Sequence, residues 1–274
     1  MNEIFSTAYL MGGLGNQMFQ IANAYAQSLD GNIQSYFKPI SQTSLQGKTT
    51  ENYVNNIFKK IIFKNDLPNV TRYSEPNWSY NHKKFDWKKS IEFYGYYQSS
   101  KNFLSFSNEI KDLFSPDDES IKYITEKYPK IKENNTLSIH VRLGDYKNFP
   151  NIHPTVSVSY LKESLRHVPK SSYIFVFSDD KNWVYNNLKF DNIIFVNEED
   201  YMELWMMSMC QNNILSNSSF SWWGGFLNKN DSKKVFVPSV WFGPNGPNNY
   251  IDIYESYHTI IKVNVLGNSL EYVT

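Results

Sequence analysis

The second half of the chain alternates short apolar runs with helical patterns, and this alternation narrows the folds that it can adopt. Apolar runs of strand length occur at residues 136–141, 173–177, 193–196, 214–215 and 235–237. Helical patterns occur between them, at residues 160–167, 183–188, 201–211 and 222–227. Short apolar strands separated by helices are typical of a parallel sheet that helices cover on both faces. We therefore predict a doubly wound α/β domain for this half.

The first half opens in the same way but becomes less regular. A short strand ends at Met11, a glycine turn follows, and a helix begins at about Asn16 with its apolar residues on one face. We also predict strands at 33–37 and 91–97 and an amphipathic helix at 54–62. The polar stretch 41–86 around this helix shows no other clear pattern.

A polar segment at residues 128–135 separates the two halves and predicts two domains, at residues 1–133 and 134–274. The N-terminal domain is expected to be the smaller and less regular of the two. In open α/β sheets, ligands bind outside the carboxyl ends of the strands. The polar motifs of this chain directly follow predicted strands, so we expect a ligand site there.

Charge, hydropathy and cysteine content limit the partners and the compartment. Lys plus Arg equals Asp plus Glu at 27 each, and because binding to a phosphate backbone needs a surplus of cations, no nucleic-acid partner is expected. We find neither an apolar run of about 18 residues nor an N-terminal signal sequence, which predicts a cytosolic protein without a membrane span. The one cysteine, Cys210, lies in an apolar helical pattern and is expected to be a buried thiol.

The first motif is the glycine turn 12–15, followed by Asn16. Glycines between a strand and a helix let the backbone approach a ligand, and the helix N-terminus offers N–H groups to an anion. Gly13 and Gly15 are therefore candidate ligand contacts, and Asn16 suits an N-cap. A purely structural turn is an equal alternative. The glycine spacing does not match a dinucleotide fingerprint, which disfavours a nicotinamide oxidoreductase.

The second motif contains His140, Arg142 and Asp145 at the end of a predicted strand. Because side chains alternate along a strand, His140 and Arg142 are expected to share a face. A guanidinium suits a diphosphate, since it binds two oxygens at once and keeps its charge. The alternative is a surface ion pair between Arg142 and Asp145.

The remaining two motifs also follow strands. Asp179 and Asp180 could accept hydrogen bonds from a base or ribose, or simply cap the next helix. The Ser-rich turn 216–221 offers hydroxyl and N–H groups to phosphate oxygens, and the adjoining Trp222 and Trp223 are candidates for core packing. The chain has no Asp-x-Asp triplet, so no metal site is expected.

In this order, the motifs resemble those of the α-1,2-fucosyltransferase family (glycosyltransferase family 11). That family carries a Gly-Asn-Gln turn, a Gly-Tyr-aromatic-Gln-Ser segment, His-x-Arg-x-Gly-Asp-Tyr, Phe-Ser-Asp-Asp and Asn-Ser-Ser-Phe-Ser-Trp-Trp. The matching segments here are residues 15–17, 95–99, 140–146, 177–180 and 217–223. Five matches in family order make the resemblance specific, whereas any single motif would not.

The resemblance implies a GT-B-like α/β fold of two Rossmann-like domains facing a cleft, with GDP-fucose bound mainly by the second. It implies an inverting transfer of fucose to the 2-hydroxyl of a terminal galactose on an oligosaccharide or glycolipid, with no metal and no cofactor beyond the donor. The expected donor-binding residues are His140, Arg142, Gly13, Gly15, Asp179, Asn217, Ser218, Ser219 and Phe220. The candidate catalytic residues are Arg142, Asn16 and Asp145.

The sequence is compatible with more than one donor contact, catalytic base and acceptor. Leu143 occupies a position where many relatives have a second arginine, so phosphate binding would depend more on backbone N–H groups. Asp145 could be the base or only the partner of Arg142, and the leaving phosphate could itself take the proton. Alternatives are a GDP-fucose-dependent transferase of other regiochemistry and a non-catalytic carbohydrate-binding protein. Residues 41–86 are expected to help choose the acceptor, and a lipid-linked acceptor would bring peripheral membrane contact.

Overall fold

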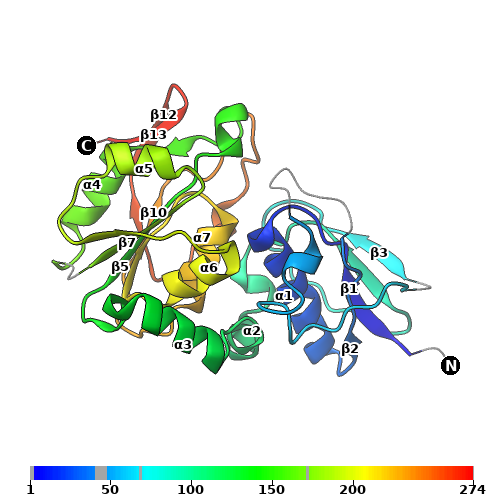
Figure 1. Cartoon of the computed structure of the whole chain (residues 1–274). Helices are drawn as coiled ribbons and strands as arrows, with labels where there is room; N and C mark the ends of the chain where they lie inside the picture. The colour runs from blue at the N-terminus through cyan, green and yellow to red at the C-terminus, as the bar shows by residue number, and fades with distance from the viewer. Residues whose placement is uncertain (1–2, 41–47, 68–69, 171–172, 274) are drawn as a thin grey trace. The chain divides into compact units, whose positions relative to one another are not determined.

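The chain folds into two compact α/β units, each built around a parallel sheet (Figure 1). The computed structural model describes residues 3–40, 48–67, 70–170 and 173–273. Unit 1 comprises Met1–Ser115 and Asn249–Glu255, and unit 2 comprises Pro116–Asn248 and Ser256–Thr274. The division falls earlier in the chain than the polar segment 128–135, and a short C-terminal segment returns to unit 1.

Unit 2 contains a six-stranded parallel sheet in the order β11-β10-β9-β5-β7-β8. The strands are β5 (Leu137–Val141), β7 (Ile174–Ser178), β8 (Ile193–Phe195), β9 (Asn212–Ile214), β10 (Val235–Pro238) and β11 (His258–Ile261). Every residue of β5, β7 and β10 is buried, as a parallel sheet covered on both faces requires. These strands confirm the pattern expected from the apolar runs. The sequence did not indicate β11, because this edge strand is largely exposed and is not a continuous apolar run.

Helices cover both faces of this sheet (Figure 1). On one side lie α4 (Val158–Arg166) and α5 (Lys181–Asn187), and on the other lie α3 (Asp118–Lys127), α6 (Asp200–Met209) and α7 (Ser219–Leu227). Trp222 and Trp223 of α7 are completely buried, which confirms their assignment to the core. A small additional sheet combines β6 (Thr155–Val156), β12 (Val263–Leu266) and β13 (Ser269–Tyr272).

Residues 128–135, interpreted from the sequence as a linker, belong to unit 2 and are structured. They contain the 3₁₀ helix η4 (Pro129–Lys132), in which Ile131 is buried. One apolar side chain among polar neighbours is too weak a pattern to reveal this packing from the sequence.

Unit 1 contains a four-stranded parallel sheet in the order β2-β1-β4-β3. Its strands are β1 (Phe5–Ala8), β2 (Gln34–Ser35), β3 (Thr71–Ser74) and β4 (Ile91–Tyr94), and its helices are α1 (Leu14–Asp30), α2 (Ser107–Leu113) and the 3₁₀ helices η1 (Thr50–Asn52), η2 (Ser100–Asn102), η3 (Leu104–Phe106) and η6 (Ile251–Ile253). The strands predicted at 33–37 and 91–97 are therefore present but shorter. The long helix α1 contacts β1 along its buried face, as the helical pattern indicated.

The helix predicted at 54–62 is wrong, because this segment forms a series of turns. The Asn56 side chain accepts the N–H of Ile57 at 2.8 Å, a hydrogen that an α-helix would give to the carbonyl of Tyr53. Such local side-chain bonds compete with helix formation. Of the apolar residues at helical spacing, Ile57 and Phe58 are nevertheless buried, at most 1% exposed, whereas Ile62 is 49% exposed.

The stretch 41–86 is organised only in part by local structure. It contains η1 and β3, while residues 41–47 and 68–69 of this stretch lie outside the described residues. Within residues 3–40, 48–67, 70–170 and 173–273, no helix combines the length and the apolar character that crossing a membrane requires.

Candidate functional site

The polar motifs of unit 2 meet where the order of its strands reverses. From β5 the chain proceeds through β7 to β8 on one side, and then crosses to β9, β10 and β11 on the other. Such a reversal leaves a crevice at the carboxyl ends of the two central strands, here β5 and β9. The Ser216 hydroxyl joins these ends, since it accepts the N–H of Arg142 at 3.0 Å and donates to the carbonyl of His140 at 2.7 Å.

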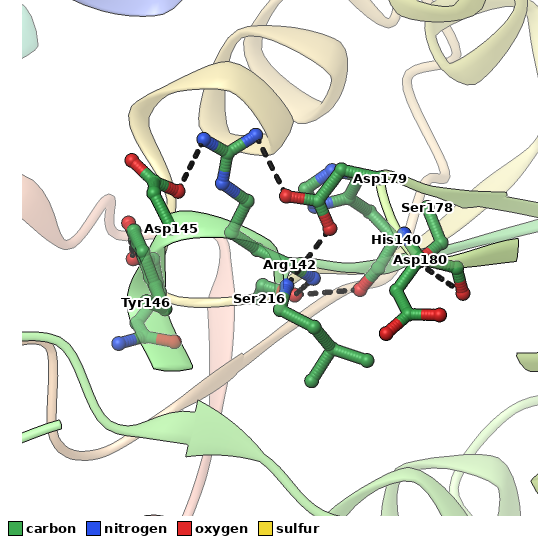
Figure 2. A network of polar contacts seen from close by, with 10 residues as sticks. His140, Arg142, Asp145, Tyr146, Ser178, Asp179, Asp180 and Ser216 are labelled. Carbon is green, nitrogen blue, oxygen red and sulfur yellow. Dashed lines mark hydrogen bonds and ion pairs between the residues drawn. The ribbon is translucent and has the colours of Figure 1, made fainter. Parts of the chain in front are cut away.

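Arg142 lies between two carboxylates at this point (Figure 2). Its guanidinium is 2.6 Å from Asp145 Oδ1 and 3.0 Å from Asp179 Oδ2, and its side chain is only 16% exposed. Burial lowers the pKa of Arg142, but the neighbouring Asp179 and Asp145 carboxylates outweigh this effect and raise it. The expected ion pair between Arg142 and Asp145 is therefore present. It is largely buried instead of lying on the surface, and Arg142 also pairs with Asp179.

Asp179 also fixes the backbone beside Arg142. Its Oδ1 accepts the N–H of Leu143 at 2.9 Å. A Cβ atom at Gly144 would lie 2.4 Å from Asp179 Oδ2, so a larger residue at this position would have to displace the Asp179 carboxylate. Asp180, by contrast, caps α5 by accepting the N–H of Trp183 at 2.9 Å, as one interpretation of the sequence proposed. The contact of Asp179 with a base or ribose stays a prediction.

His140 is buried in the same region. Its ring centroid lies 5.3 Å from that of Phe220 on α7. Burial, with smaller contributions from the cations of Arg142 and Lys181, lowers the pKa of His140 to about 3, so the imidazole is neutral at neutral pH. Its Nδ1 atom is buried and has no hydrogen-bond partner among the described residues. A buried polar atom of this kind could receive a hydrogen bond from, or give one to, a ligand.

Tyr146 connects the arginine motif to the Ser-rich turn, a role that sequence reasoning missed. Its hydroxyl donates to the carbonyl of Asn217 at 3.0 Å, and Arg142 lies over its ring at 5.6 Å from the centroid. Burial raises the pKa of Tyr146 to about 12, so the phenol keeps its proton. The ring of His153 stacks on that of Tyr146 at 4.6 Å. No sequence pattern pointed to His153, which lies outside every motif.

The Ser-rich turn leads into the N-terminus of α7. Asn217 is buried, and its amide donates to the carbonyls of Pro154 at 2.9 Å and Trp241 at 3.0 Å, so this side chain also holds the turn together. Ser218 is the N-cap residue of α7, and Ser219 and Phe220 begin the helix. The N-terminus of a helix offers backbone N–H groups to an anion, and the phosphate contacts of these residues stay a prediction.

The glycine turn of unit 1 differs in one respect from expectation. Gly13, not Asn16, is the N-cap residue of α1, because the helix already begins at Leu14. Asn16 lies in the first helical turn, and its side-chain oxygen accepts a hydrogen bond from Gln98 Nε2 at 2.8 Å. Two of the motifs, at residues 15–17 and 95–99, are thus joined directly. Gly15 is buried within α1.

The structure therefore assembles the predicted residues in two sets. In unit 2 it brings together His140, Arg142, Asp145, Asp179, Asn217, Ser218, Ser219 and Phe220. In unit 1, Gly13, Gly15 and Asn16 form the start of α1. Among the described residues, no three His, Cys, Asp or Glu side chains come together as metal ligands would.

Similar solved structures show the fold of the protein. The chain is similar to the crystal structure of the fucosyltransferase NodZ from Bradyrhizobium, with a TM-score of 0.57 and 12% identity over 83% of this chain and 94% of that one. It is also similar to POFUT1, crystallised with GDP-fucose, with a TM-score of 0.53 and 11% identity over 85% of this chain and 96% of that one. The parallel sheets flanked by helices and these neighbours show a GT-B-like α/β fold, which confirms the expected fold class.

The sequence comparisons identify the family. The model of glycosyl transferase family 11 matches residues 2–242, and the chain belongs to this family. An alpha-1,2-colitosyltransferase of Escherichia coli is 29% identical over 93% of this chain and 98% of the relative. The O-antigen biosynthesis glycosyltransferase WbnK of Escherichia coli is 28% identical over 86% of this chain and 94% of the relative. The protein is thus a fucosyltransferase-like glycosyltransferase.

Proposed function

We propose that the protein transfers L-fucose from GDP-fucose to the 2-hydroxyl of a terminal galactose on an oligosaccharide or glycolipid, with inversion and without a metal. The observation that carries this proposal is the Arg142 guanidinium, held in place between Asp145 and Asp179 at the strand-order reversal. The solved relatives crystallised with GDP or GDP-fucose share the fold of this chain. Arg142 lies at the strand-order reversal, where open α/β sheets bind their ligands, and this location supports the proposal.

The chemistry follows from charge development during transfer. As the bond between the anomeric carbon and GDP breaks, positive charge grows on the sugar and negative charge on the leaving phosphate. A pre-oriented cation and the N–H groups at the start of α7 stabilise that phosphate without reorganising. In this proposal Arg142, His140 and residues 217–220 hold the donor, with Gly13 and Gly15 as further backbone contacts and Asp179 as a contact for base or ribose.

Two groups are candidates for the base that takes the proton of the acceptor hydroxyl. Asp145 is the first candidate, and its Oδ1 already accepts a hydrogen bond from Arg142 at 2.6 Å. The leaving phosphate is the second candidate, since Arg142 brings it to the same place. Asn16 is proposed to lie at the reacting centre and to orient the acceptor.

The colitosyltransferase relative favours a second candidate donor, GDP-colitose. Colitose lacks the 3-hydroxyl of fucose. A site that hydrogen-bonds a substrate hydroxyl rejects the analogue without it by about 10⁴-fold, whereas a site that makes no such bond accepts both. The ratio of kcat/KM for the two donors therefore distinguishes the candidates.

The test is a transfer assay with the purified chain. GDP-fucose and GDP-colitose are offered separately with a panel of β-galactosides, with and without EDTA, and the linkage in the product is determined by NMR. We expect a 1,2-linkage to galactose and an unchanged rate in EDTA. A different linkage would favour the alternative of other regiochemistry. Acceptor binding with neither transfer nor release of GDP would favour a non-catalytic carbohydrate-binding protein.

The cytosol, where a GDP-sugar donor would be met, is the proposed compartment. If the acceptor is lipid-linked, the protein meets it by peripheral contact with a membrane surface, which sedimentation with lipid vesicles would measure.

A further inference from the structure

Glu75 is a largely buried carboxylate in the stretch of unit 1 whose sequence showed little pattern. It directly follows β3, and its N–H donates to the carbonyl of Tyr94 at 2.8 Å. Its side chain accepts the N–H of Tyr96 at 2.7 Å and the N–H of Tyr97 at 3.0 and 3.1 Å. Burial raises the pKa of Glu75, and these two N–H donors offset part of that effect. The carboxylate thus holds two consecutive peptide groups.

The segment that Glu75 holds includes a residue with a strained backbone. Tyr97 has φ = 51°, in the left-handed region that non-glycine residues rarely adopt. A Cβ atom at Gly95 would lie 2.3 Å from Glu75 Cβ and 2.5 Å from Oε2. The backbone at Gly95 therefore packs directly against the Glu75 side chain, and a larger residue would clash with it. Asn102 supports the other end, since its amide donates to the carbonyls of Tyr97 and Ser99 at 3.1 Å each.

The turn at residues 95–98 ends in the side chain that contacts Asn16. Gln98 is 9% exposed and donates to Asn16 Oδ1 at 2.8 Å. On its other side, the Asn16 amide packs against Gly12, where a Cβ atom would lie 2.5 Å from Asn16 Nδ2. Gln17 in turn donates to the carbonyl of Gly12 at 3.0 Å and keeps that turn in place. The orientation of the Asn16 amide is therefore determined from both sides.

We propose that Glu75 is a positioning residue for the transfer reaction: it holds the turn at residues 95–98, and through Gln98 it sets the orientation of the Asn16 amide. This inference rests on the proposed role of Asn16 at the reacting centre. Glu75 acts on Asn16 indirectly. It accepts backbone N–H groups of the turn, and Gln98 of the same turn donates a hydrogen bond to Asn16. Substitution of Glu75 should therefore lower kcat, because Asn16 is then misoriented while the donor site of unit 2 is unchanged.

The experiment compares Glu75→Gln, Gln98→Ala, Asn16→Ala and the double variant Glu75→Gln/Asn16→Ala in the full chain. Glu92→Gln is the matched control, since Glu92 lies on β4 and pairs with the exposed Arg72 outside the turn. We expect kcat to fall roughly 10- to 100-fold in Glu75→Gln and in Gln98→Ala, with the KM for the GDP-sugar donor unchanged. Glu92→Gln should stay within about twofold of the wild type. Gln98→Ala tests the link even if Glu75→Gln folds poorly.

The double variant decides between positioning and a separate effect. If Glu75 acts through Asn16, Glu75→Gln changes kcat by less than about twofold once Asn16 is alanine. An equal loss in both backgrounds, or a wild-type kcat in Gln98→Ala, would overturn the inference. If the wild type transfers neither fucose nor colitose, the proposed function fails. The link is then tested by urea unfolding of Glu75→Gln, Gln98→Ala and their combination, where shifts in midpoint that simply add would refute it.

Discussion

Removal of the Arg142 guanidinium tests both the stability and the function of the donor site. In Arg142→Ala, the carboxylates of Asp145 and Asp179 lose the cation that lies 2.6 and 3.0 Å from them. The side chains of the three residues are 16%, 22% and 25% exposed, so solvent screens the loss only in part. Because the leaving phosphate then lacks its cation, this variant should lose transfer activity. The structure predicts a loss of stability as well.

The magnitude follows from these exposures. An exposed pair contributes about 0–1 kcal/mol, whereas breaking a fully buried pair costs about 3–5 kcal/mol. For this partly buried arrangement we expect a loss of about 2–3 kcal/mol in the free energy of unfolding, or roughly 30- to 160-fold in the folding equilibrium. Loss of the cation at the leaving phosphate should lower kcat by about 100- to 1000-fold.

The assay is urea unfolding at pH 7, combined with GDP binding by calorimetry and transfer kinetics. Arg166→Ala is the control, because Arg166 is 74% exposed and solvent screens its ion pair with Glu163. The double variant Arg142→Ala/Asp179→Asn should regain about 1 kcal/mol, since it removes one of the two facing charges while an amide oxygen still accepts the N–H of Leu143. An unchanged unfolding midpoint in Arg142→Ala, or no recovery in the double variant, would refute the reasoning.

Three further predictions concern His140, Cys210 and Gly144. The pKa of His140 falls from an unfolded value near 6.5 to about 3, so its contribution to stability is present above pH 6.5 and is lost as the pH decreases towards 3. Between pH 6.5 and 5 the free energy of unfolding should decrease by about 2 kcal/mol through this group. The urea midpoint of His140→Asn should therefore vary less with pH over that range than that of the wild type. Burial raises the pKa of the Cys210 thiol, so it should react with a thiol reagent at neutral pH only as urea unfolds the chain, and rapid labelling of the native protein would contradict its burial. Gly144→Ala places a methyl group 2.4 Å from Asp179 Oδ2 and should cost about 1–3 kcal/mol together with activity; a wild-type midpoint and rate would show that Asp179 is free to move.

Local sequence patterns determined most of unit 2 and its site. The apolar runs at 136–141 and 173–177 appear as β5 and β7, because a strand buried on both faces needs an unbroken apolar run. The site residues could be predicted because they directly follow those strands, and parallel strands bring their carboxyl ends to one edge. Unit 1 was less predictable. At 54–62 the helical spacing was present, but the Asn56 side chain takes the hydrogen bond on which a helix depends.

What each site residue touches was decided only by the tertiary structure. Asp179 binds the N–H of Leu143 across 36 residues of sequence, and Glu75 binds that of Tyr97 across 22. His153 stacks on Tyr146 although it belongs to no motif. The sequence by itself determined which residue types stand at the strand ends and hence the chemistry available to the protein. The partners of these residues depend on which strands lie side by side. Strand order results from the packing of the whole sheet, and a local sequence pattern does not specify it.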